Sequence, residues 1–461
     1  MSLDRNWLNH LKTFGMAQGL ETTYALSARL GMPQSDIPGI HIAGSNGKGT
    51  CAAIMSNAIS MTGTTCGLFT SPHLCYVEER IRIDGEPIST QSFDECLAEL
   101  RAACDQEPKL QPTYFEATYL IALLAFRKYG VLRAVYETGL GGRLDATRTA
   151  EADLCVLTDL ALEHTDVLGE TLEEIALEKA AIARQGATFV ATWTYDEAAR
   201  DAIKGSVPPP QRGYWWRPDR ELLFTWFEDE ESHRPIPNDP GFTGFPSYHD
   251  RAAKLAQAAL SVSSDPRLIL AAEYVPMARI GTQWPGRMQW LEHEGVPVLF
   301  DAAHNPSGMA QSCKQIIDAM EQDEAPTPGV VILASGPQTD MIGFLQPLVE
   351  LIVTGEVGKV ILTESSSYRR TPIRANVLAD ELASHLPEVE LIVERDSFTA
   401  AYRAVEISNE SDPASSVLVL GSIYLAGDVM KALELDSWAS LSLVFGEEDF
   451  ELMGDVEEPT S

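Results

Sequence analysis

Basic residues are scarce in this 461-residue chain, which carries 34 Lys and Arg against 67 Asp and Glu, a formal net charge of −33. Such a field repels nucleic acids and anionic membrane surfaces, so binding to either through bulk electrostatics is excluded. An anionic substrate must instead be held by positive groups gathered locally. We therefore expect small-molecule partners and a monomer.

Paired cysteines and long apolar runs are also missing. The seven cysteines are odd in number and form no C-x-x-C pair, which favours free core thiols in a reducing compartment over a disulfide framework. The first residues, Met1 to Trp7, contain no apolar signal segment, and no run of 18 apolar residues occurs. These absences predict a cytoplasmic protein.

Apolar runs of strand length alternate with helix-length segments, which predicts α/β domains with mostly parallel sheets. The length suggests two domains. We expect a nucleotide-binding domain over 1–280 and a smaller Rossmann-like domain over 285–445, with a linker between Pro276 and Arg287. The Pro- and Trp-rich segment 206–247 is interpreted as an irregular insertion with a short hairpin near Leu222 to Trp226. The acidic tail 446–461 is predicted to be disordered.

A glycine-rich turn from Gly44 to Thr50 joins an apolar strand (Ile40 to Ala43) to a predicted helix (Cys51 to Met61). Glycines allow backbone N–H groups to approach anionic oxygens, and a helix N-terminus adds positive potential. The turn departs from the usual phosphate-loop pattern because Gly49 separates Lys48 from Thr50. The phosphate-binding residues are predicted to be Gly44, Ser45, Asn46, Gly47, Lys48, Gly49 and Thr50.

Polar residues follow four predicted strands where each one ends. These are Thr50, Ser71, Glu137 and His164, the last preceded by Glu163. Carboxyl ends of parallel strands face the ligand crevice in such sheets. One carboxylate, one imidazole and two hydroxyls suit Mg²⁺ ions that are shared with phosphate oxygens. Each residue taken alone fits a cap or turn equally well.

Lys179 falls on the apolar face of a predicted helix, Leu172 to Arg184. Either it extends its amine to solvent, or its charge has a partner, or the amine is neutral and chemically available. In the second domain, Asp301 and His304 lie where a strand meets a helix, and Arg287 lies in the hinge. They fit nucleotide contacts, or an N-cap and a packed imidazole.

Nine sequence blocks together resemble the folylpolyglutamate synthase and dihydrofolate synthase family, ATP-dependent amide ligases related to the Mur ligases. The blocks are HIAGSNGKGT (41–50), GLFTSPHL (67–74), ERIRIDGEPIS (79–89), YFEATYL (114–120), ETGLGGRLDAT (137–147), EHTDVLGETLEEIALEKAAI (163–182), WPGRMQW (284–290), FDAAHNP (300–306) and LGSIYLAGDV (420–429). The extra glycine after Lys48 is a feature of that family.

The resemblance implies that a pterin carboxylate attacks the γ-phosphate of ATP and that L-glutamate then displaces phosphate from the acyl phosphate. It implies catalytic roles for Lys48, Lys179 and His164, with Lys179 carbamylated. It further implies Mg²⁺ at Thr50, Ser71, Glu137 and His164. The remaining ATP contacts would come from Arg287, Asp301 and His304.

The chain departs from the family pattern in a few places. Asp250 and Ala253 replace the glutamine and asparagine of a His-Gln-x-x-Asn block, Gln338-Thr339-Asp340 replaces Asp-Lys-Asp, and Glu163 stands where aspartate is usual. Two alternatives therefore stay open. One is a Mur-type ligase for a different acid, and the other is a nucleotide-binding regulatory protein without ligase activity.

Overall fold

The computed structural model describes residues 3–11, 19–209, 212–218, 222–226, 234–235, 248–322, 324–365, 371–411 and 415–444. The chain forms two compact units. Unit 1 comprises 1–73, 77–282 and the segment from Leu443 onward, and unit 2 comprises 74–76 and 283–442. The predicted tail 446–461 and much of 206–247 lie outside the described residues.

Unit 1 is built on a ten-stranded sheet in the order β10-β9-β8-β7-β6-β1-β5-β2-β3-β4. The six strands from β8 to β2 in that order run parallel, and the two ends of the sheet are antiparallel. The strands are β1 (Gly39–Ala43), β2 (Cys66–Phe69), β3 (Ile81–Ile83), β4 (Glu86–Pro87), β5 (Arg133–Glu137), β6 (Ala152–Leu157), β7 (Thr188–Thr192), β8 (Arg212–Arg217), β9 (Leu222–Thr225) and β10 (Arg234–Pro235).

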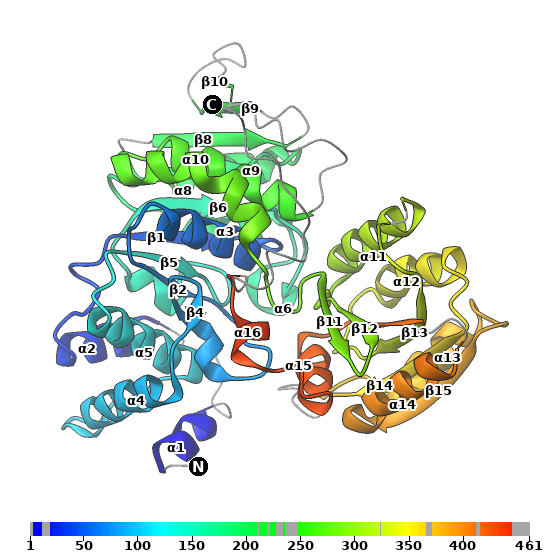
Figure 1. The fold of residues 1–461 in the computed structure, drawn as a ribbon. Helices are drawn as coiled ribbons and strands as arrows, with labels where there is room; N and C mark the ends of the chain where they lie inside the picture. Colours follow the sequence, from blue (N-terminus) through cyan, green and yellow to red (C-terminus); the bar gives the residue numbers. More distant parts are fainter. Residues whose placement is uncertain are drawn as a thin grey trace, which may run out of the picture. The chain divides into compact units, whose positions relative to one another are not determined.

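Helices flank this sheet, and α3, α9 and α10 pack on one another while α3 contacts β1, β2 and β5 (Figure 1). Residues from β6 and β7 join α7 and α8 in a separate buried cluster. The helices are α1 (Leu3–His10), α2 (Glu21–Arg29), α3 (Lys48–Met61), α4 (Thr90–Asp105), α5 (Tyr114–Lys128), α6 (Thr165–Leu168), α7 (Leu172–Ala180), α8 (Glu197–Ser206), α9 (Tyr248–Ser261) and α10 (Pro266–Gly281), with 3₁₀ turns η2 (Val77–Arg80) and η3 (Ala146–Thr149).

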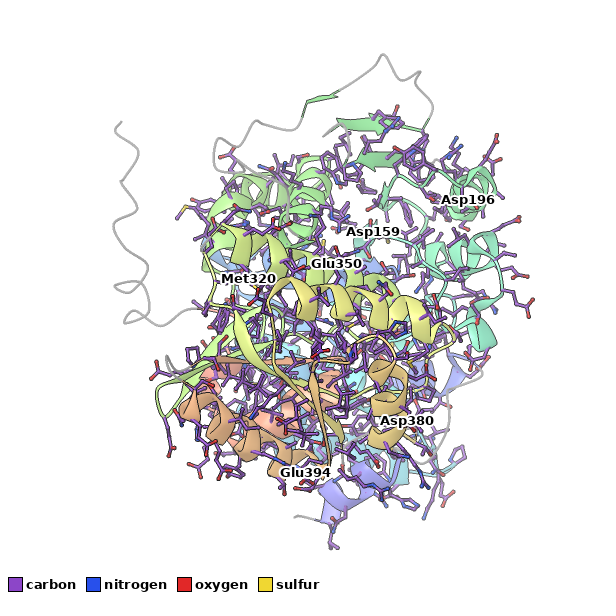
Figure 2. The ribbon with its side chains drawn as sticks, turned by 90° about the vertical axis from the view of Figure 1, so that its right-hand side faces the viewer. Asp159, Asp196, Met320, Glu350, Asp380 and Glu394 are labelled. Carbon is purple, nitrogen blue, oxygen red and sulfur yellow. The ribbon has the colours of Figure 1, made fainter. Side chains whose placement is uncertain are left out.

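Local chemistry explains several element boundaries. Asp84 and Gly85 both have positive φ, as the tight turn between β3 and β4 requires. Thr113 and Glu116 form a reciprocal capping box at the start of α5. Asp196, labelled in Figure 2, caps α8 by accepting the Ala199 N–H at 2.8 Å. That helix was missing from the sequence prediction.

The interpretation of 206–247 as irregular is wrong for its first part. Strand β8 pairs parallel with β7, and β9 pairs antiparallel with β8, so the segment extends the main sheet. Aromatic residues in β8 suit a pleated, half-buried surface. Gly213 permits the packing, because a Cβ there would lie 2.2 Å from the Trp226 ring. The expected hairpin near Leu222 to Trp226 is therefore real, with β8 as its other strand.

Unit 2 holds a six-stranded sheet in the order β11-β12-β16-β13-β14-β15, parallel except for β11. Its strands are β11 (Gln289–His293), β12 (Val296–Phe300), β13 (Pro328–Leu333), β14 (Lys359–Glu364), β15 (Glu390–Asp396) and β16 (Ser416–Leu420). Its helices are α11 (Pro306–Glu321), α12 (Met341–Thr354), α13 (Ala375–Ala383), α14 (Ser397–Glu410), α15 (Ile423–Ala432) and α16 (Trp438–Leu441). The predicted α/β fold with two sheets is confirmed.

Two further boundaries differ from the sequence prediction. Helix α10 runs through Pro276 to Gly281, so the linker begins later than expected. Val275 and Ala278 on its buried face continue the packing beyond the proline. Unit 2 also takes in Leu74–Tyr76, whose Leu74 and Cys75 are buried in the unit 2 core.

All seven cysteines are free and buried, as the sequence predicts. Burial raises the pKa of the Cys66 thiol to about 12. Among the described residues, no helix has the length and apolar character needed to cross a bilayer.

Trp215 tests whether β8 belongs to the core. Its side chain is 1% exposed and packs against Trp193 and Trp226. We expect Trp215→Ala to lower the free energy of unfolding by about 3–5 kcal/mol, because the cavity cannot close fully. Urea unfolding followed by circular dichroism measures this. Met277→Ala, at an exposed position of α10, should change it by less than about 1 kcal/mol. Equal losses in both variants would contradict the core position of β8.

Candidate active site at the carboxyl edge of the unit 1 sheet

Four adjacent parallel strands of unit 1 end at one edge and bring several of the predicted unit 1 site residues to that edge. The sheet order β6-β1-β5-β2 makes β1 and β5 neighbours, and Ile42 is in register with Glu137. The residues that follow these strands are therefore close: the turn from Gly44 after β1, Ser71 shortly after β2, and Asp159 after β6. This edge is where ligands bind in open α/β sheets.

The turn from Gly44 to Gly47 is fixed by its neighbours across the sheet. Gly44 has φ of 145°, and a Cβ there would lie 1.9 Å from Thr158 Oγ1, so only glycine fits. Ser45 N–H donates to the carbonyl of Asp159, the residue labelled in Figure 2, at 2.7 Å. Gly47 has φ of 80° and precedes α3 directly. The helix begins at Lys48, three residues earlier than predicted, which places Gly49 and Thr50 in its first turn.

Two lysines converge on a single acceptor in this turn. Lys48 Nζ and Lys179 Nζ each donate to the Gly44 carbonyl at 2.9 Å, and Lys48 also donates to the Ser45 carbonyl at 3.2 Å. The Lys179 residue is 2% exposed. Burial and the nearby positive charge of Lys48 lower the pKa of Lys179 to about 8. The amine thus has a substantial neutral fraction at mildly alkaline pH.

Glu163 supplies the charge partner that Lys179 requires. Its Oε1 lies 2.8 Å from Lys179 Nζ. Burial works to raise the pKa of Glu163, but the charges of Lys48 and Lys179 outweigh it, so that pKa lies below its ordinary value. His164 is exposed, has φ of 46°, and is the N-cap residue directly before α6. Its positive form also favours the Glu163 carboxylate, so it lies within electrostatic range of the same group.

Glu137 and Ser71 are joined directly. Glu137 is 5% exposed at the end of β5, and its Oε2 accepts the Ser71 backbone N–H at 3.1 Å. Within the described part of the chain, no group of three or more His, Cys, Asp or Glu side chains could hold a metal ion. One oriented carboxylate with hydroxyls fits Mg²⁺, which keeps several waters and shares phosphate oxygens, and does not fit a metal held by protein ligands alone.

The segment after Glu137 is organised by an aspartate that the sequence reasoning did not single out. Asp145 Oδ2 accepts the N–H groups of Gly139 and Leu140 at 2.8 and 3.0 Å. Gly142 lies against α7, because a Cβ there would lie 2.8 Å from the Lys179 carbonyl. An aspartate close after a glycine-rich run, and before Thr147, is the signal that could have found it.

In unit 2, Asp301 is 1% exposed and its carboxylate accepts from Met288 N, Ala303 N and Ser312 Oγ at 3.1, 2.9 and 2.7 Å. These bonds hold the turn before β11 to α11. His304 is exposed, with Nδ1 2.9 Å from the Ala302 carbonyl oxygen, and Arg287 is partly exposed. Asp301 therefore anchors this turn, and the N-cap interpretation is wrong, because Asn305 caps α11 by accepting the Gly308 N–H at 2.7 Å. The expectation of a packed imidazole is wrong as well, since His304 is exposed.

The departures from the family pattern have local explanations. Asp250 pairs with Arg279 Nε at 2.5 Å between α9 and α10, and Ala253 is buried in α9. Gln338 Nε2 donates to the His304 carbonyl at 3.0 Å, and Asp340 caps α12. These residues support packing and loop position.

Comparison with known proteins found matches to dihydrofolate synthases and folylpolyglutamate synthases. Residues 287–432 match the family described as dihydrofolate synthetase, C-terminal domain. The dihydrofolate synthase/folylpolyglutamate synthase of Bacillus subtilis is 30% identical over 457 residues, covering 93% of this chain and 98% of that protein.

Solved structures agree with this. A bifunctional folylpolyglutamate synthase/dihydrofolate synthase of Yersinia pestis, complexed with AMPPNP and Mn ion, is 25% identical with a TM-score of 0.70, covering 94% of this chain and 98% of its own. A structure of a bifunctional enzyme of the same name with Mn, AMPPNP and L-glutamate bound has the same identity, TM-score and coverage.

The pairing of Glu163 with Lys179 predicts a pKa change. We expect Glu163→Gln to move the pKa of Lys179 further below about 8, because the carboxylate is what raises it against burial and Lys48. NMR titration of isotope-labelled lysine side chains measures this. Glu178→Gln is the matched control, since the Glu178 carboxylate pairs with Arg143 at 2.9 Å. A Lys179 pKa that is unchanged or higher in Glu163→Gln would refute the pairing.

Proposed function

Because this chain belongs to the dihydrofolate synthase/folylpolyglutamate synthase family, we propose that it is an ATP-dependent ligase joining L-glutamate to dihydropteroate, to a folate, or to both. One observation carries the proposal. Lys48 and Lys179 meet at the Gly44 carbonyl beside Glu163, at the sheet edge where Glu137 and Ser71 also lie. A local cluster of positive groups on a strongly acidic protein is what a triphosphate requires.

The proposed reaction has two steps. The substrate carboxylate attacks the γ-phosphorus of ATP, the bond to ADP breaks, and an acyl phosphate forms. The amino group of L-glutamate then attacks the acyl carbon, inorganic phosphate leaves, the nitrogen loses a proton, and an amide results. Positioning and charge neutralisation supply the acceleration, as in other phosphoryl transfers.

The residues of unit 1 have stated roles in this proposal. The N–H groups of Gly44 to Thr50 cradle the phosphates, and Lys48 moves from the Gly44 and Ser45 carbonyls to the transferred phosphate. Thr50, Ser71, Glu137 and His164 would hold Mg²⁺ directly or through water. When bound, Mg²⁺ neutralises the developing charge on the phosphate oxygens.

Lys179 has two chemically distinct forms in this scheme. As an ammonium it binds Glu163 and the Gly44 carbonyl. As a neutral amine it can react with CO₂ to give a carbamate, which is an anion able to accept a cation. The lowered pKa of Lys179 supports that reaction, since only the neutral amine is nucleophilic. We include carbamylation in the proposal on this ground.

Roles in unit 2 are narrower than expected. Arg287 and His304 are partly exposed or exposed and keep a proposed contact with ATP. The Asp301 carboxylate already accepts three hydrogen bonds. A hydrogen bond from the nucleotide would therefore have to share one of its oxygens with these donors. The proposal also takes the protein to be a cytoplasmic monomer.

A Mur-type ligase for another acid is the second candidate. It is favoured by the hairpin β8–β9 and by Asp250 and Ala253, where the family usually has glutamine and asparagine. The regulatory alternative is disfavoured by the intact Lys48, Glu137 and Lys179.

Turnover with defined substrates tests the function. We expect the purified chain, with ATP, Mg²⁺ and L-glutamate, to release ADP only when dihydropteroate or a reduced folate is added, and EDTA to abolish this. Growth of a strain lacking dihydrofolate synthase would test the dihydropteroate activity. If the protein releases no ADP with any of the pterins or folates, the proposal is rejected. Tight ATP binding without turnover on any acid would favour the regulatory alternative.

Lys179 gives the sharpest variant. We expect Lys179→Ala to lower turnover by about 100-fold or more, with added bicarbonate unable to restore it, because no amine remains to be carbamylated. Lys314→Ala is the control, since that side chain is 67% exposed in unit 2 and should leave turnover unchanged. A Lys179→Ala enzyme with near-normal rates would remove Lys179 from the mechanism.

A further inference from the structure

Beneath the site, a buried chain of hydrogen bonds begins at a histidine that the proposed mechanism does not use. His41 lies in the middle of β1, is 0% exposed, and approaches Thr147 Oγ1 with its Nε2 at 2.7 Å. Thr147 Oγ1 donates to Asp145 Oδ1 at 2.5 Å. Asp145 Oδ2 in turn accepts the N–H groups of Gly139 and Leu140. The chain thus runs from the phosphate-loop strand to the backbone just after Glu137.

Arg184, which contacts His41, fixes the direction of every hydrogen bond from His41 to Asp145. Arg184 Nη1 lies 3.1 Å from His41 Nδ1, and a guanidinium can only donate. His41 Nδ1 must therefore accept, so the ring is neutral with its hydrogen on Nε2. That hydrogen is donated to Thr147 Oγ1, and the hydroxyl hydrogen is left for Asp145. Burial and the charges of Arg184 and Arg148 lower the pKa of His41, which agrees with a neutral ring.

The chain leaves little freedom at Asp145. Its carboxylate accepts four hydrogen bonds, from the N–H groups of Gly139, Leu140 and Thr147 and from the Thr147 hydroxyl. Residues 139–144 lie in neither helix nor strand. Asp145 therefore ties down the backbone that would otherwise let the end of β5, and with it the Glu137 carboxylate, shift.

Arg184 also links this network to the segment that follows α7, the helix that carries Lys179. Arg184 Nη2 donates to the Arg148 carbonyl at 2.8 Å, and Arg184 Nη1 donates to the Ile182 carbonyl at 3.0 Å. Arg148 donates to the carbonyls of Ala181 and Ala183 at 2.7 and 2.9 Å. These residues follow α7 directly, one turn beyond Lys179. The phosphate-loop strand, the Glu137 segment and the Lys179 helix therefore meet in one buried polar network.

We propose that His41, through Thr147 and Asp145, is a positioning residue that holds the Glu137 segment at the metal-binding geometry. The inference rests on the proposed function, because that function gives Glu137 its metal. Buried networks of this kind orient a ligand without touching the metal or the substrate, and their loss typically weakens metal binding or activity by about 10–100-fold. Misplacement of Glu137 by about 1 Å can lower turnover by about 100-fold.

Two threonines in η3 provide a matched pair. Thr147 carries the chain, whereas the buried hydroxyl of Thr149 bonds to the Ala146 carbonyl and Tyr119 instead. We expect Thr147→Val to lower kcat by about 10–100-fold and to raise the half-saturating Mg²⁺ concentration about tenfold, with the KM for ATP within about threefold. Thr149→Val should leave all three values within about twofold, and Thr147→Ser, which keeps the hydroxyl, should recover most of kcat.

A binding measurement separates this inference from the proposed reaction. Mn²⁺ affinity in the presence of AMPPNP, read by electron paramagnetic resonance, should fall about tenfold in Thr147→Val and stay unchanged in Thr149→Val. Unchanged Mn²⁺ affinity and kcat in Thr147→Val, or equal losses in both variants, would overturn the positioning role. If the unaltered protein releases no ADP with any pterin or folate, the proposed function fails, and the Mn²⁺ measurement still decides the positioning role.

A second variant tests the same proposal if the Thr147→Val protein does not fold. Arg184 is partly exposed, so Arg184→Gln removes the head of the chain at a less buried position. We expect it to weaken Mn²⁺ affinity in the same direction, by about tenfold or less. An Arg184→Gln protein that folds and binds Mn²⁺ as tightly as the unaltered chain would overturn the proposed link between Arg184, His41 and Glu137.

Discussion

The site depends on two ammonium groups that share one backbone carbonyl. Lys48 and Lys179 both donate to Gly44, and only the nearby Glu163 carboxylate is seen to pair with either of them among the described contacts. Burial disfavours the charged amine and the like charge of Lys48 adds to that effect, which is why the pKa of Lys179 falls to about 8. The arrangement favours any change that brings in negative charge, whether a triphosphate near Lys48 or a carbamate on Lys179.

That local charge must work against the rest of the molecule. A net charge of −33 creates an unfavourable field for ATP and for a pterin carboxylate alike. In the proposed site, positive groups close to the phosphates would prevail because their interaction is short-range and partly shielded from water, whereas most of the acidic residues act through solvent and salt. Substrate capture in this protein is therefore governed by contact geometry more than by long-range attraction.

Much of the fold could be predicted from the sequence, since apolar runs and glycine-rich turns locate β1, β5, β6 and the parallel strands of unit 2, whereas the antiparallel edge strand β11 was not predicted. The β8 strand was missed because prolines flank it and its aromatic residues are consecutive, without the alternation typical of a strand. The linker was predicted to begin at Pro276, which lies inside α10. For Lys179 the sequence leaves three possibilities open, an amine extended to solvent, a paired charge or a neutral amine, and the pairing with Glu163 follows only from tertiary contact. The Asp145 clamp and the His41 chain are likewise products of tertiary packing, which no local pattern encodes.

The division of the chain between the two units has a consequence for how they can be separated. A polypeptide ending at Thr282 would lose Leu443 and Val444, which bond to Gly85 and pair with Thr282. It would also leave Leu74 and Cys75 without the core in which they are buried. Truncation between the two units therefore exposes apolar side chains that are buried in the full chain. A chain cut at Thr282 is for this reason a poor candidate for an independently folding nucleotide-binding fragment.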